Sequence, residues 1–285
     1  MLASAACFAV STSLVKFMGP DFPAVLQTFY RQVAGIIALL PFMVRSRGAV
    51  FKTTRLRILL FRAAAGSAGM ILAFYSYQEM PMADANALSF TRTLWLVPLA
   101  AFVLGERVGV LRVSATAVGF VGVLFMVQPA AAASFGWPAA AALGSAFLFA
   151  LTVTGMKIMT RDHSAMTITV YSAVLGLFFV LPFAIGVWRW PDATELLLLA
   201  IMGVSALGAQ YFFITAMTVG DAAAMAPLDY TRLIFSVTIG YLFFQETPNS
   251  TAMIGALIII AATLFITLRE AQAQKGLTRP PAQPE

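Results

Sequence analysis

At 285 residues the chain is long enough for one or two domains, but its composition says more about its class than its length does. Apolar residues make up 60% of the chain and charged residues 11%, against roughly 45–50% and about 25% in soluble domains. The net charge of +6 does not indicate nucleic-acid binding, because the basic residues cluster beside apolar stretches on alternate loops. Composition therefore excludes an ordinary soluble domain and predicts an all-α polytopic membrane protein.

Apolar stretches near the ~20 residues that a helical span needs recur along almost the whole chain. Ten transmembrane helices are expected. In chain order they cover residues 2–18, 23–44, 58–79, 83–104, 110–128, 139–159, 166–187, 194–218, 221–244 and 250–268. No cleavable signal is expected, because the apolar sequence after Met1 is predicted to be the first span itself. Residues 270–285 are polar and carry prolines, which predicts a disordered cytoplasmic tail.

Basic residues set the expected orientation. They are densest between Arg45 and Arg57, and most of the others fall in loops on that same side. The opposite loops and span ends hold only Lys16 and Arg189. By the positive-inside rule both termini are expected in the cytoplasm, with the protein in a bacterial cytoplasmic (inner) membrane.

One short sequence occurs twice. Thr91-Arg92 and Thr231-Arg232 lie 140 positions apart, and so do Glu106 and Glu246. Further matches at an offset of 141 are Lys16/Lys157, Tyr30/Tyr171, Gly35/Gly176, Pro41/Pro182 and Phe42/Phe183. Each half then has five spans, so the second half is expected upside down relative to the first. The predicted organisation is a first repeat at 1–129, a linker at 130–137 and a second repeat at 138–269, the inverted arrangement of secondary transporters.

The residues around the repeat also carry a family resemblance. In the first half the signature is Phe74-Tyr75, Met82–Ala85, Ala87–Thr91 and Leu104–Arg107; in the second it is Ala226–Tyr230, Arg232-Leu233, and Glu246 before Pro248. With these motifs the chain resembles the drug/metabolite transporter superfamily, as a ten-span member with two EamA-type domains over about 2–268. One departure is Arg92-Thr93, where the family usually has a small residue or proline, and this indicates an anionic feature in the ligand.

The resemblance implies a function. It implies a secondary transporter that exports small organic metabolites by alternating access through a central cavity between the repeats. The most similar group is the bacterial exporters of aromatic and other hydrophobic amino acids. Other solutes (nucleotide-like, cofactor-like or cationic), a channel and a scaffold protein remain open alternatives. The scarcity of carboxylates inside the spans favours weak or no proton coupling.

The two arginines are the leading ligand candidates. At 1.5 Å per residue, Arg92 lies ~13 Å and Arg232 ~17 Å into the bilayer, near the middle of its core. A charge there costs on the order of 3 kcal/mol, so both side chains are expected to face the bundle interior or a water-filled cavity. Arg92 is the better candidate, because Asp229 stands one turn from Arg232 and can neutralise it, whereas Arg92 has only Ser89 nearby.

Spacing suggests what the arginines bind. Residues three apart share a helix side, and two such rows are Ser89, Arg92, Trp95 and Asp229, Arg232, Phe235. A guanidinium beside an aromatic ring suits a solute with a carboxylate and an apolar or aromatic side chain.

Polar and aromatic residues of other spans complete the candidate list. Expected substrate-binding residues are Tyr75, Tyr77, Gln78, Gln210, Tyr211 and Tyr230, with hydrogen bonding between helices as the alternative role. Structural or gating roles are expected for Asp229, for Glu106 and Glu246 at span ends, and for Arg31, as an ion-pair partner or a snorkelling side chain.

Catalytic and metal-binding patterns are missing from the sequence. His163 and Cys7 are single, so no metal cluster or Cys/His nucleophile can be assembled, and no phosphate-binding loop ending in Gly-Lys-Ser/Thr occurs. No enzyme activity, cofactor or nucleic-acid partner is therefore expected. The expected partners are a small-molecule substrate and the lipid bilayer, and the expected state is a monomer.

Overall fold

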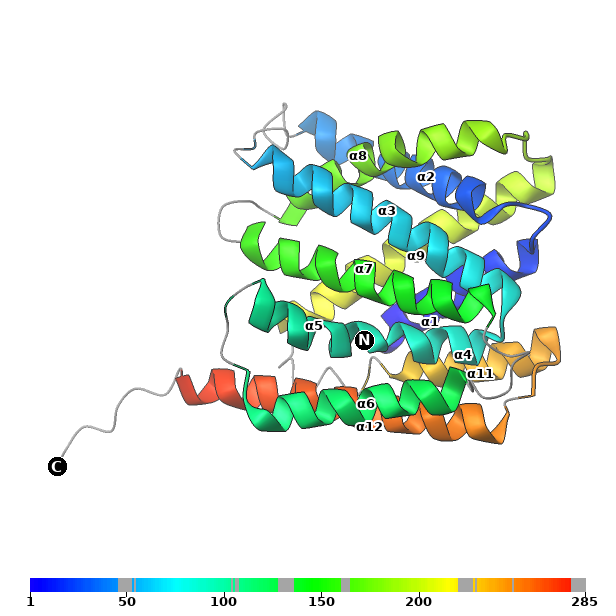
Figure 1. Ribbon diagram of the computed structural model, residues 1–285. Coiled ribbons are helices and arrows are strands. Elements are labelled where there is room, and N and C mark those ends of the chain that lie inside the picture. Colours follow the sequence, from blue (N-terminus) through cyan, green and yellow to red (C-terminus); the bar gives the residue numbers. More distant parts are fainter. Residues whose placement is uncertain are drawn as a thin grey trace.

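The computed structural model describes residues 1–45, 53, 55–103, 105, 108–127, 136–159, 165–219, 228, 230–247 and 249–277. In these parts all regular secondary structure is helical (Figure 1). The helices before the predicted linker are α1 (Leu2–Met18), α2 (Ala24–Arg45), α3 (Leu56–Glu79), α4 (Met82–Ser89), α5 (Thr91–Phe102) and α6 (Val110–Val127). After it follow α7 (Trp137–Met159), α8 (Ala165–Gly186), α9 (Ala193–Val219), α11 (Thr231–Phe244) and α12 (Ser250–Leu277).

Four of these helices contain stretches long and apolar enough to cross a membrane: 56–79, 137–155, 167–186 and 250–269. Shorter apolar helices cover 2–18, 110–126, 193–209 and 231–244. The outer surface of the bundle is strongly apolar, with Phe102 exposed to 88%, Trp137 to 83% and Phe243 to 75%. A bundle that displays such side chains needs hydrocarbon around it rather than water.

The helix bounds agree with the sequence analysis in most places. α1, α2, α3, α6, α7, α8 and α9 begin and end within two residues of the predicted spans. The fourth predicted span is wrong as one continuous helix, because it is divided at Phe90 into α4 and α5. The disordered tail is wrong over 270–277, where α12 continues to Leu277 through residues such as Glu270 and Lys275 that favour helix.

Turns end the helices where the sequence supplies them. α1 ends at Gly19, whose φ of 62° suits a residue without a side chain, and its amide donates to the Lys16 carbonyl at 3.0 Å. α3 ends at Met80, which is extended because Pro81 follows it. These turns place the end of α1 and the start of α4 at the same end of the bundle.

Helices of the two predicted repeats interleave (Figure 1). α2 packs along α8 at one side of the bundle and α6 along α12 at the other, while α1 packs against α9 and α3 against α7. The 141-residue offset makes α1 the counterpart of α7 and α3 the counterpart of α9. On this correspondence, the α1–α9 contact and the α3–α7 contact are equivalent contacts. This pairing brings residues far apart in sequence to the middle of the bundle.

Candidate functional site

The fourth span is interrupted at Phe90. Its φ of −68° and ψ of −18° are helical, but the hydrogen bonds around it close over three residues: its amide donates to the Ala87 carbonyl at 3.2 Å, and the Thr93 amide donates to the Phe90 carbonyl at 3.0 Å. The hydroxyl of Thr91 donates to the Leu88 carbonyl at 2.6 Å. Thr91 therefore stabilises the break by supplying a donor at the end of α4.

The start of α11 repeats this geometry. Tyr230 has a φ of −70° and a ψ of −12°, and its carbonyl accepts from the Leu233 amide at 3.0 Å. The Thr231 hydroxyl donates to the Leu228 carbonyl at 2.6 Å, as Thr91 does at the other break. The doubled sequence thus forms doubled backbone geometry.

The two breaks meet. The rings of Phe90 and Tyr230 pack with their centroids 4.6 Å apart and their planes at 45°. Both belong to an apolar cluster that includes Val123 and Ile259. The hydroxyl of Tyr230 shares a 2.6 Å hydrogen bond with Thr263 of α12, so this predicted ligand group is engaged within the fold.

Arg232 lies at the first turn of α11 against aromatic rings. Its guanidinium carbon is 4.7 Å from the centroid of Phe8 and 5.0 Å from that of Phe90. Each such contact contributes about 0.5–2 kcal/mol, more where water is excluded. Stacking uses the flat faces of the guanidinium, whereas a carboxylate is bound through its N–H edge.

A buried hydrogen-bond chain runs beside Arg232. The Tyr77 hydroxyl donates to Oδ1 of Asn86 at 3.0 Å, Nδ2 of Asn86 donates to the Ser236 hydroxyl at 2.6 Å, and that hydroxyl donates to the Arg232 carbonyl at 2.8 Å. The chain joins α3, α4 and α11. The positive charges of Arg232 and Arg92 both act on the Tyr77 hydroxyl. The Ser89 side chain also interacts with Tyr77, so four residues of the predicted ligand set, Tyr77, Ser89, Arg92 and Arg232, come together here.

Two residues of that set lie elsewhere. Nε2 of Gln78 donates to the carbonyls of Gly19 at 2.7 Å and Phe22 at 2.9 Å, which fastens the α1–α2 turn to α3. Tyr75 is half-buried and packs against the apolar core at that end of the bundle.

Ser89 lies in α4, whereas Arg92 and Trp95 lie three residues apart in α5, beyond the break at Phe90. Ser89 ends α4, and its hydroxyl donates to a carbonyl of that helix at 2.7 Å. The ring of Trp95 meets Phe120 of α6 and Phe147 of α7, with centroids 4.9 and 5.2 Å away. The predicted row is therefore divided between two helices, with Ser89 in α4 and Arg92 and Trp95 in α5.

Some predicted residues lie outside the described parts of the chain, and one described residue, Arg31, has no described hydrogen-bond or ion-pair partner. Asp229, Glu106 and the side chains of Gln210 and Tyr211 lie outside the described residues. Arg31 lies in α2 and is half-buried. In the described parts of the chain its guanidinium takes part in no hydrogen bond and no ion pair.

An ion pair closes one end of the bundle. Nζ of Lys16 pairs with Oε1 of Glu246, and both side chains are largely buried, at 14% and 15% exposure. Lys16 also donates to the Met80 carbonyl at 2.6 Å, and Oε2 of Glu246 accepts the Met82 amide at 2.9 Å. These contacts tie α1, the α3–α4 turn and the α11–α12 turn together at what we call the Glu246 end.

The backbone before Glu246 is shaped for this contact. Gln245 adopts a left-handed conformation with φ of 55°, and the Glu246 amide donates to the Gly240 carbonyl at 3.0 Å. A Cβ on Gly240 would lie 2.6 Å from Oε2 of Glu246, so any larger residue here requires the carboxylate to move. The Lys16 ammonium also lies 5.6 Å from the Phe244 ring.

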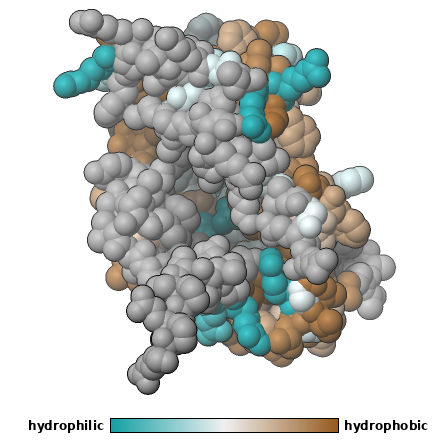
Figure 2. Space-filling view, turned by 90° about the vertical axis from the view of Figure 1, so that its left-hand side faces the viewer, coloured by the Kyte–Doolittle hydropathy of each residue, from teal (hydrophilic) through white to brown (hydrophobic). Residues whose placement is uncertain are grey.

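The opposite end of the bundle, where α2 and α7 end, is hollowed. Figure 2 looks onto this end and shows a hollow near its centre with hydrophilic surface inside. An ion pair thus lies at one end of the bundle, and the surface of the other end is hollowed.

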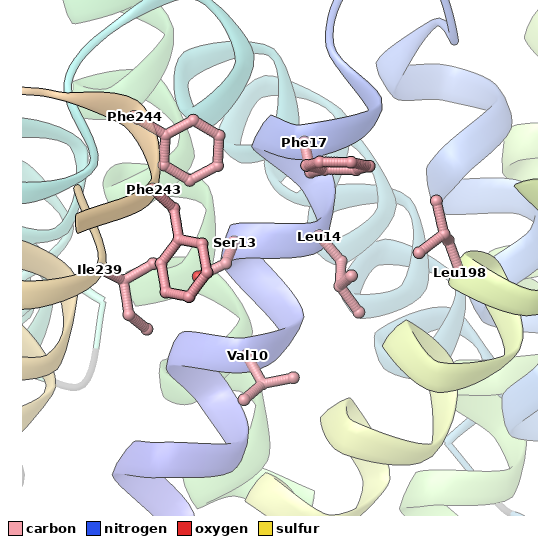
Figure 3. Close-up of a pocket in the computed structure, with 8 residues that line it drawn as sticks. All are labelled: Val10, Ser13, Leu14, Phe17, Leu198, Ile239, Phe243 and Phe244. Atoms are coloured by element: carbon pink, nitrogen blue, oxygen red, sulfur yellow. The ribbon is translucent and has the colours of Figure 1, made fainter. Parts of the chain in front are cut away.

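A separate groove of about 340 Å³ lies on the side of the bundle between α1, α9 and α11 (Figure 3). Its lining residues are Val10, Ser13, Leu14, Phe17, Leu198, Ile239, Phe243 and Phe244. The hydroxyl of Ser13 donates to a carbonyl of its own helix at 2.6 Å, so the wall offers a polar solute almost nothing. Such a groove suits hydrocarbon rather than the solute of the polar site.

The sequence analysis missed several of these residues. Phe8, Asn86 and Ser236 were not singled out, and Lys16 was not paired with Glu246. A signal existed for Phe8, since Phe149 lies 141 positions later. For Asn86 the available signal was an amide inside a span.

Comparison with known proteins gives one consistent family. The EamA-like transporter family matches residues 1–128 and 136–268. The S-adenosylmethionine uptake transporter of Rickettsia prowazekii (strain Madrid E) is 30% identical over 268 residues, covering 94% of this chain and 90% of that protein. The riboflavin transporter of Rhizobium johnstonii is 31% identical over 260 residues, covering 89% and 84%. The pseudopaline exporter CntI of Pseudomonas aeruginosa (strain UCBPP-PA14) is 28% identical over 269 residues, covering 91% and 92%.

A solved crystal structure shares the fold. It aligns with a TM-score of 0.65 at 17% identity and covers 95% of this chain and 97% of its own. The named relatives move different solutes, and none of these names refers to amino-acid export. Their shared feature is transport of a small metabolite, which agrees with the helical bundle and with the residues of the doubled motif. The chain belongs to the EamA-like transporter family and is a transporter of small metabolites.

Proposed function

We propose that the chain is a secondary transporter for a metabolite that combines a carboxylate with a planar aromatic or heteroaromatic ring. The observation that carries this proposal is the position of Arg232 against the rings of Phe8 and Phe90, with Arg92 two residues past the break at Phe90. Guanidinium edges bind a carboxylate through paired N–H donors. A planar ring fits the same layer of aromatic side chains.

The helix breaks support the same ligand. α5 and α11 both begin at the breaks, so their N-terminal backbone amides lie beside the arginines. The N-terminus of a helix carries a partial positive charge that favours anionic groups. Interrupted helices whose N-termini point at anionic substrate groups are a recurring device of secondary transporters.

Alternating access is the mechanism we propose. In this mechanism the Lys16–Glu246 ion pair closes one end, and the hollow at the other end is the entrance to the pathway. With the orientation expected from the basic loops, the hollow end is cytoplasmic. The repeats at 1–129 and 138–269 then rock against each other, which exposes the site to each side in turn. The match of the family to two separate stretches and the twice-made contacts of α1–α9 and α3–α7 support this arrangement.

Two solutes are the first members of the class to test. S-adenosylmethionine carries a carboxylate and an adenine ring, and relatives at 30–32% identity bear its name. Tryptophan represents the aromatic amino acids that the sequence analysis favoured, and we propose export as its physiological direction. For each solute a decarboxylated analogue exists, so the need for the carboxylate can be tested by comparing transport of the two forms.

The test is counterflow in proteoliposomes with purified protein. We expect S-adenosylmethionine or tryptophan to move at least about tenfold better than its decarboxylated form, since one charged hydrogen-bonded contact contributes about 1.5–3 kcal/mol. Riboflavin supplies a ring without a carboxylate. Equal transport of the decarboxylated forms, or preference for riboflavin, contradicts the proposal. Arg189→Met is the control, because Arg189 pairs with Glu195 in the α8–α9 turn, away from the helix breaks.

We also propose that the solute gradient, and not a proton gradient, drives transport. Asp84 and Glu246, which interact electrostatically, lie near the closed end rather than at the helix breaks. Flux is measured with and without a pH gradient across the same vesicles. A strong dependence of the flux on the pH gradient overturns this part of the proposal.

A further inference from the structure

Helix α2 carries a positive charge that the described contacts leave without a partner. Arg31 takes part in no hydrogen bond, ion pair or ring contact within the described parts of the chain. Other basic side chains of the bundle differ: Lys16 pairs with Glu246, and Arg62 donates to the hydroxyl of Ser172. A cation inside a membrane bundle is costly unless it meets an anion or borders a water-filled space.

The direction of Arg31 follows from its neighbours on α2. Nε2 of Gln27 donates to the Val15 carbonyl of α1 at 3.3 Å. Ala34 lies against Gly203 of α9, where an added Cβ would be 2.6 Å from the Ala34 Cβ. Arg31 comes four residues after Gln27 and three before Ala34, so all three share one helix face. That face is directed toward α1 and α9.

The neighbouring faces of α2 are occupied by other contacts. Gln32 lies against Gly176 of α8. The ring of Tyr30 packs against Trp188, with centroids 6.0 Å apart. Arg31 itself keeps part of its side chain accessible. Its side chain is therefore directed toward α1 and α9, away from the faces that contact α8 and Trp188.

The depth of Arg31 matches that of the helix breaks. Gln27 of α2 contacts Val15 of α1, and the two helices are antiparallel. Residues that precede Val15 in α1 and residues that follow Gln27 in α2 therefore both lie toward the hollow end. At 1.5 Å per residue, Arg31 lies about 6 Å and Phe8 about 10 Å from this level, in the same direction. Phe8 is the ring on which Arg232 stacks. The two arginines are therefore separated by less than one helix turn in depth.

They approach the interior from opposite walls. α2 packs against α3, α8 and α9, whereas α11 packs against α1 and α4. Figure 1 shows α2 and α11 on opposite sides of α1 and α7. A solute held between them meets a guanidinium at each end.

We propose that Arg31 is a second anion-binding residue of the transport pathway, and that the preferred solute has a ring and two acid groups. One acid group binds Arg31, and the other binds the guanidinium groups at the helix breaks. This inference rests on the proposed function and narrows its substrate class from ring-bearing carboxylates in general to those that carry a second acid group.

The test compares two probes that differ by one carboxylate: phenylsuccinate and 3-phenylpropionate. Their KM values are measured in proteoliposomes for the wild type, Arg31→Met and Arg31→Lys. We expect the wild type to prefer phenylsuccinate by about tenfold or more, since a charged hydrogen bond is involved. Arg31→Met should bring the ratio of the two KM values close to one, and Arg31→Lys should leave it between these limits. Arg189→Met should keep the wild-type ratio.

A second measurement uses the wild type alone and decides the question if Arg31→Met does not fold. Phenylglyoxal modifies accessible guanidinium groups, and mass spectrometry gives the rate at Arg31 itself. We expect phenylsuccinate to slow that rate at least threefold and 3-phenylpropionate to change it little. The same run in chloride and in gluconate separates a solute carboxylate from an inorganic anion, and equal protection by chloride overturns the inference.

The outcomes distinguish this inference from the function on which it rests. A wild type that moves both probes without preference, or an Arg31→Met variant that keeps the preference, overturns the role of Arg31 and leaves ring-carboxylate transport standing. A folded wild type that moves neither probe nor any ring carboxylate overturns both.

Discussion

Phe90 and Tyr230 occupy equivalent places 140 positions apart, and their rings pack against each other with centroids 4.6 Å apart. Each ring belongs to the residue at which a helix begins anew, and a Thr-Arg pair follows each one. The two copies of the motif therefore do more than mirror one another at a distance. They form one structure in the centre of the bundle, and the Arg232 guanidinium lies against one ring of this pair.

The threonine of each break contributes to stability. Thr231→Val keeps the shape of the side chain but removes the 2.6 Å hydrogen bond to the Leu228 carbonyl, so we expect a loss of about 1 kcal/mol. In detergent this corresponds to a fall in Tm of about 2 °C. The control is Thr238→Val on exposed α11 surface, where the hydroxyl bonds a carbonyl inside a regular helix. Equal falls in both variants contradict a special role for the break.

Arg232 is expected to act through both its charge and its planar shape. Arg232→Lys keeps the charge and loses the fork, and we expect KM for a ring carboxylate to rise about tenfold. Phe8→Leu removes one stacked ring and should raise KM about threefold or more, in line with a cation–π contact. Phe178→Leu, at a ring exposed to 66%, is the control. If Arg232→Lys transports as well as the wild type, the paired N–H donors of the guanidinium have no role in substrate binding.

The Lys16–Glu246 pair should determine how firmly its end is closed. Lys16→Glu and Glu246→Lys each place like charges together in a largely buried site, so we expect transport to fall at least tenfold. The double exchange restores opposite charges and should recover transport to within about threefold, as a coupled pair does. The same exchange at Arg189 and Glu195, within one turn, should change transport by less than twofold. Failure of the double exchange to recover transport argues against a gate.

Gly240 should behave as part of that gate. Gly240→Ala places a Cβ 2.6 Å from Oε2 of Glu246 and displaces the carboxylate. We expect the variant to reproduce the transport defect of Glu246→Gln, although no charge has changed. Gly35→Ala on α2 is the control, because its Cβ meets nothing within 4 Å, and it should be neutral or stabilising. If Gly240→Ala and Gly35→Ala have the same transport rate and the same melting curve, the close contact between Gly240 and Glu246 has no role in the gate.

Hydropathy predicted most helix bounds because bilayer thickness fixes how long an apolar run must be. It did not predict the break at Phe90, because no glycine or proline marks it and its dihedral angles remain helical. Only the hydrogen bonds change there, and they depend on the Thr91 hydroxyl. The helical extension of α12 was missed because polar composition was taken as a sign of disorder, although Glu270 and Lys275 are good helix formers.

The site was predicted in part. The internal repeat singled out the two arginines, and both act electrostatically on Tyr77; their role as ligand groups stays a prediction. Asn86 and Ser236, which link to Tyr77, come from segments 150 positions apart that only the interleaving of helices brings together. The sequence predicted a structural or gating role for Glu246 but no pairing with Lys16, because nothing in the local sequence of either residue indicates a partner at the far end of the chain.

The contact between α6 and α12 has a consequence for motion. A Cβ on Gly122 would lie 2.9 Å from the Gly255 carbonyl, and one on Gly255 would lie 2.6 Å from the Gly122 carbonyl, so the two backbones touch with no side chain between them. Backbones this close cannot slide, because the next residues along would collide. Helices α6 and α12 then form a rigid pair, and the other helices move relative to it. Spin labels on α6 and α12 should keep one separation through a transport cycle, while labels on α1 and α11 change theirs.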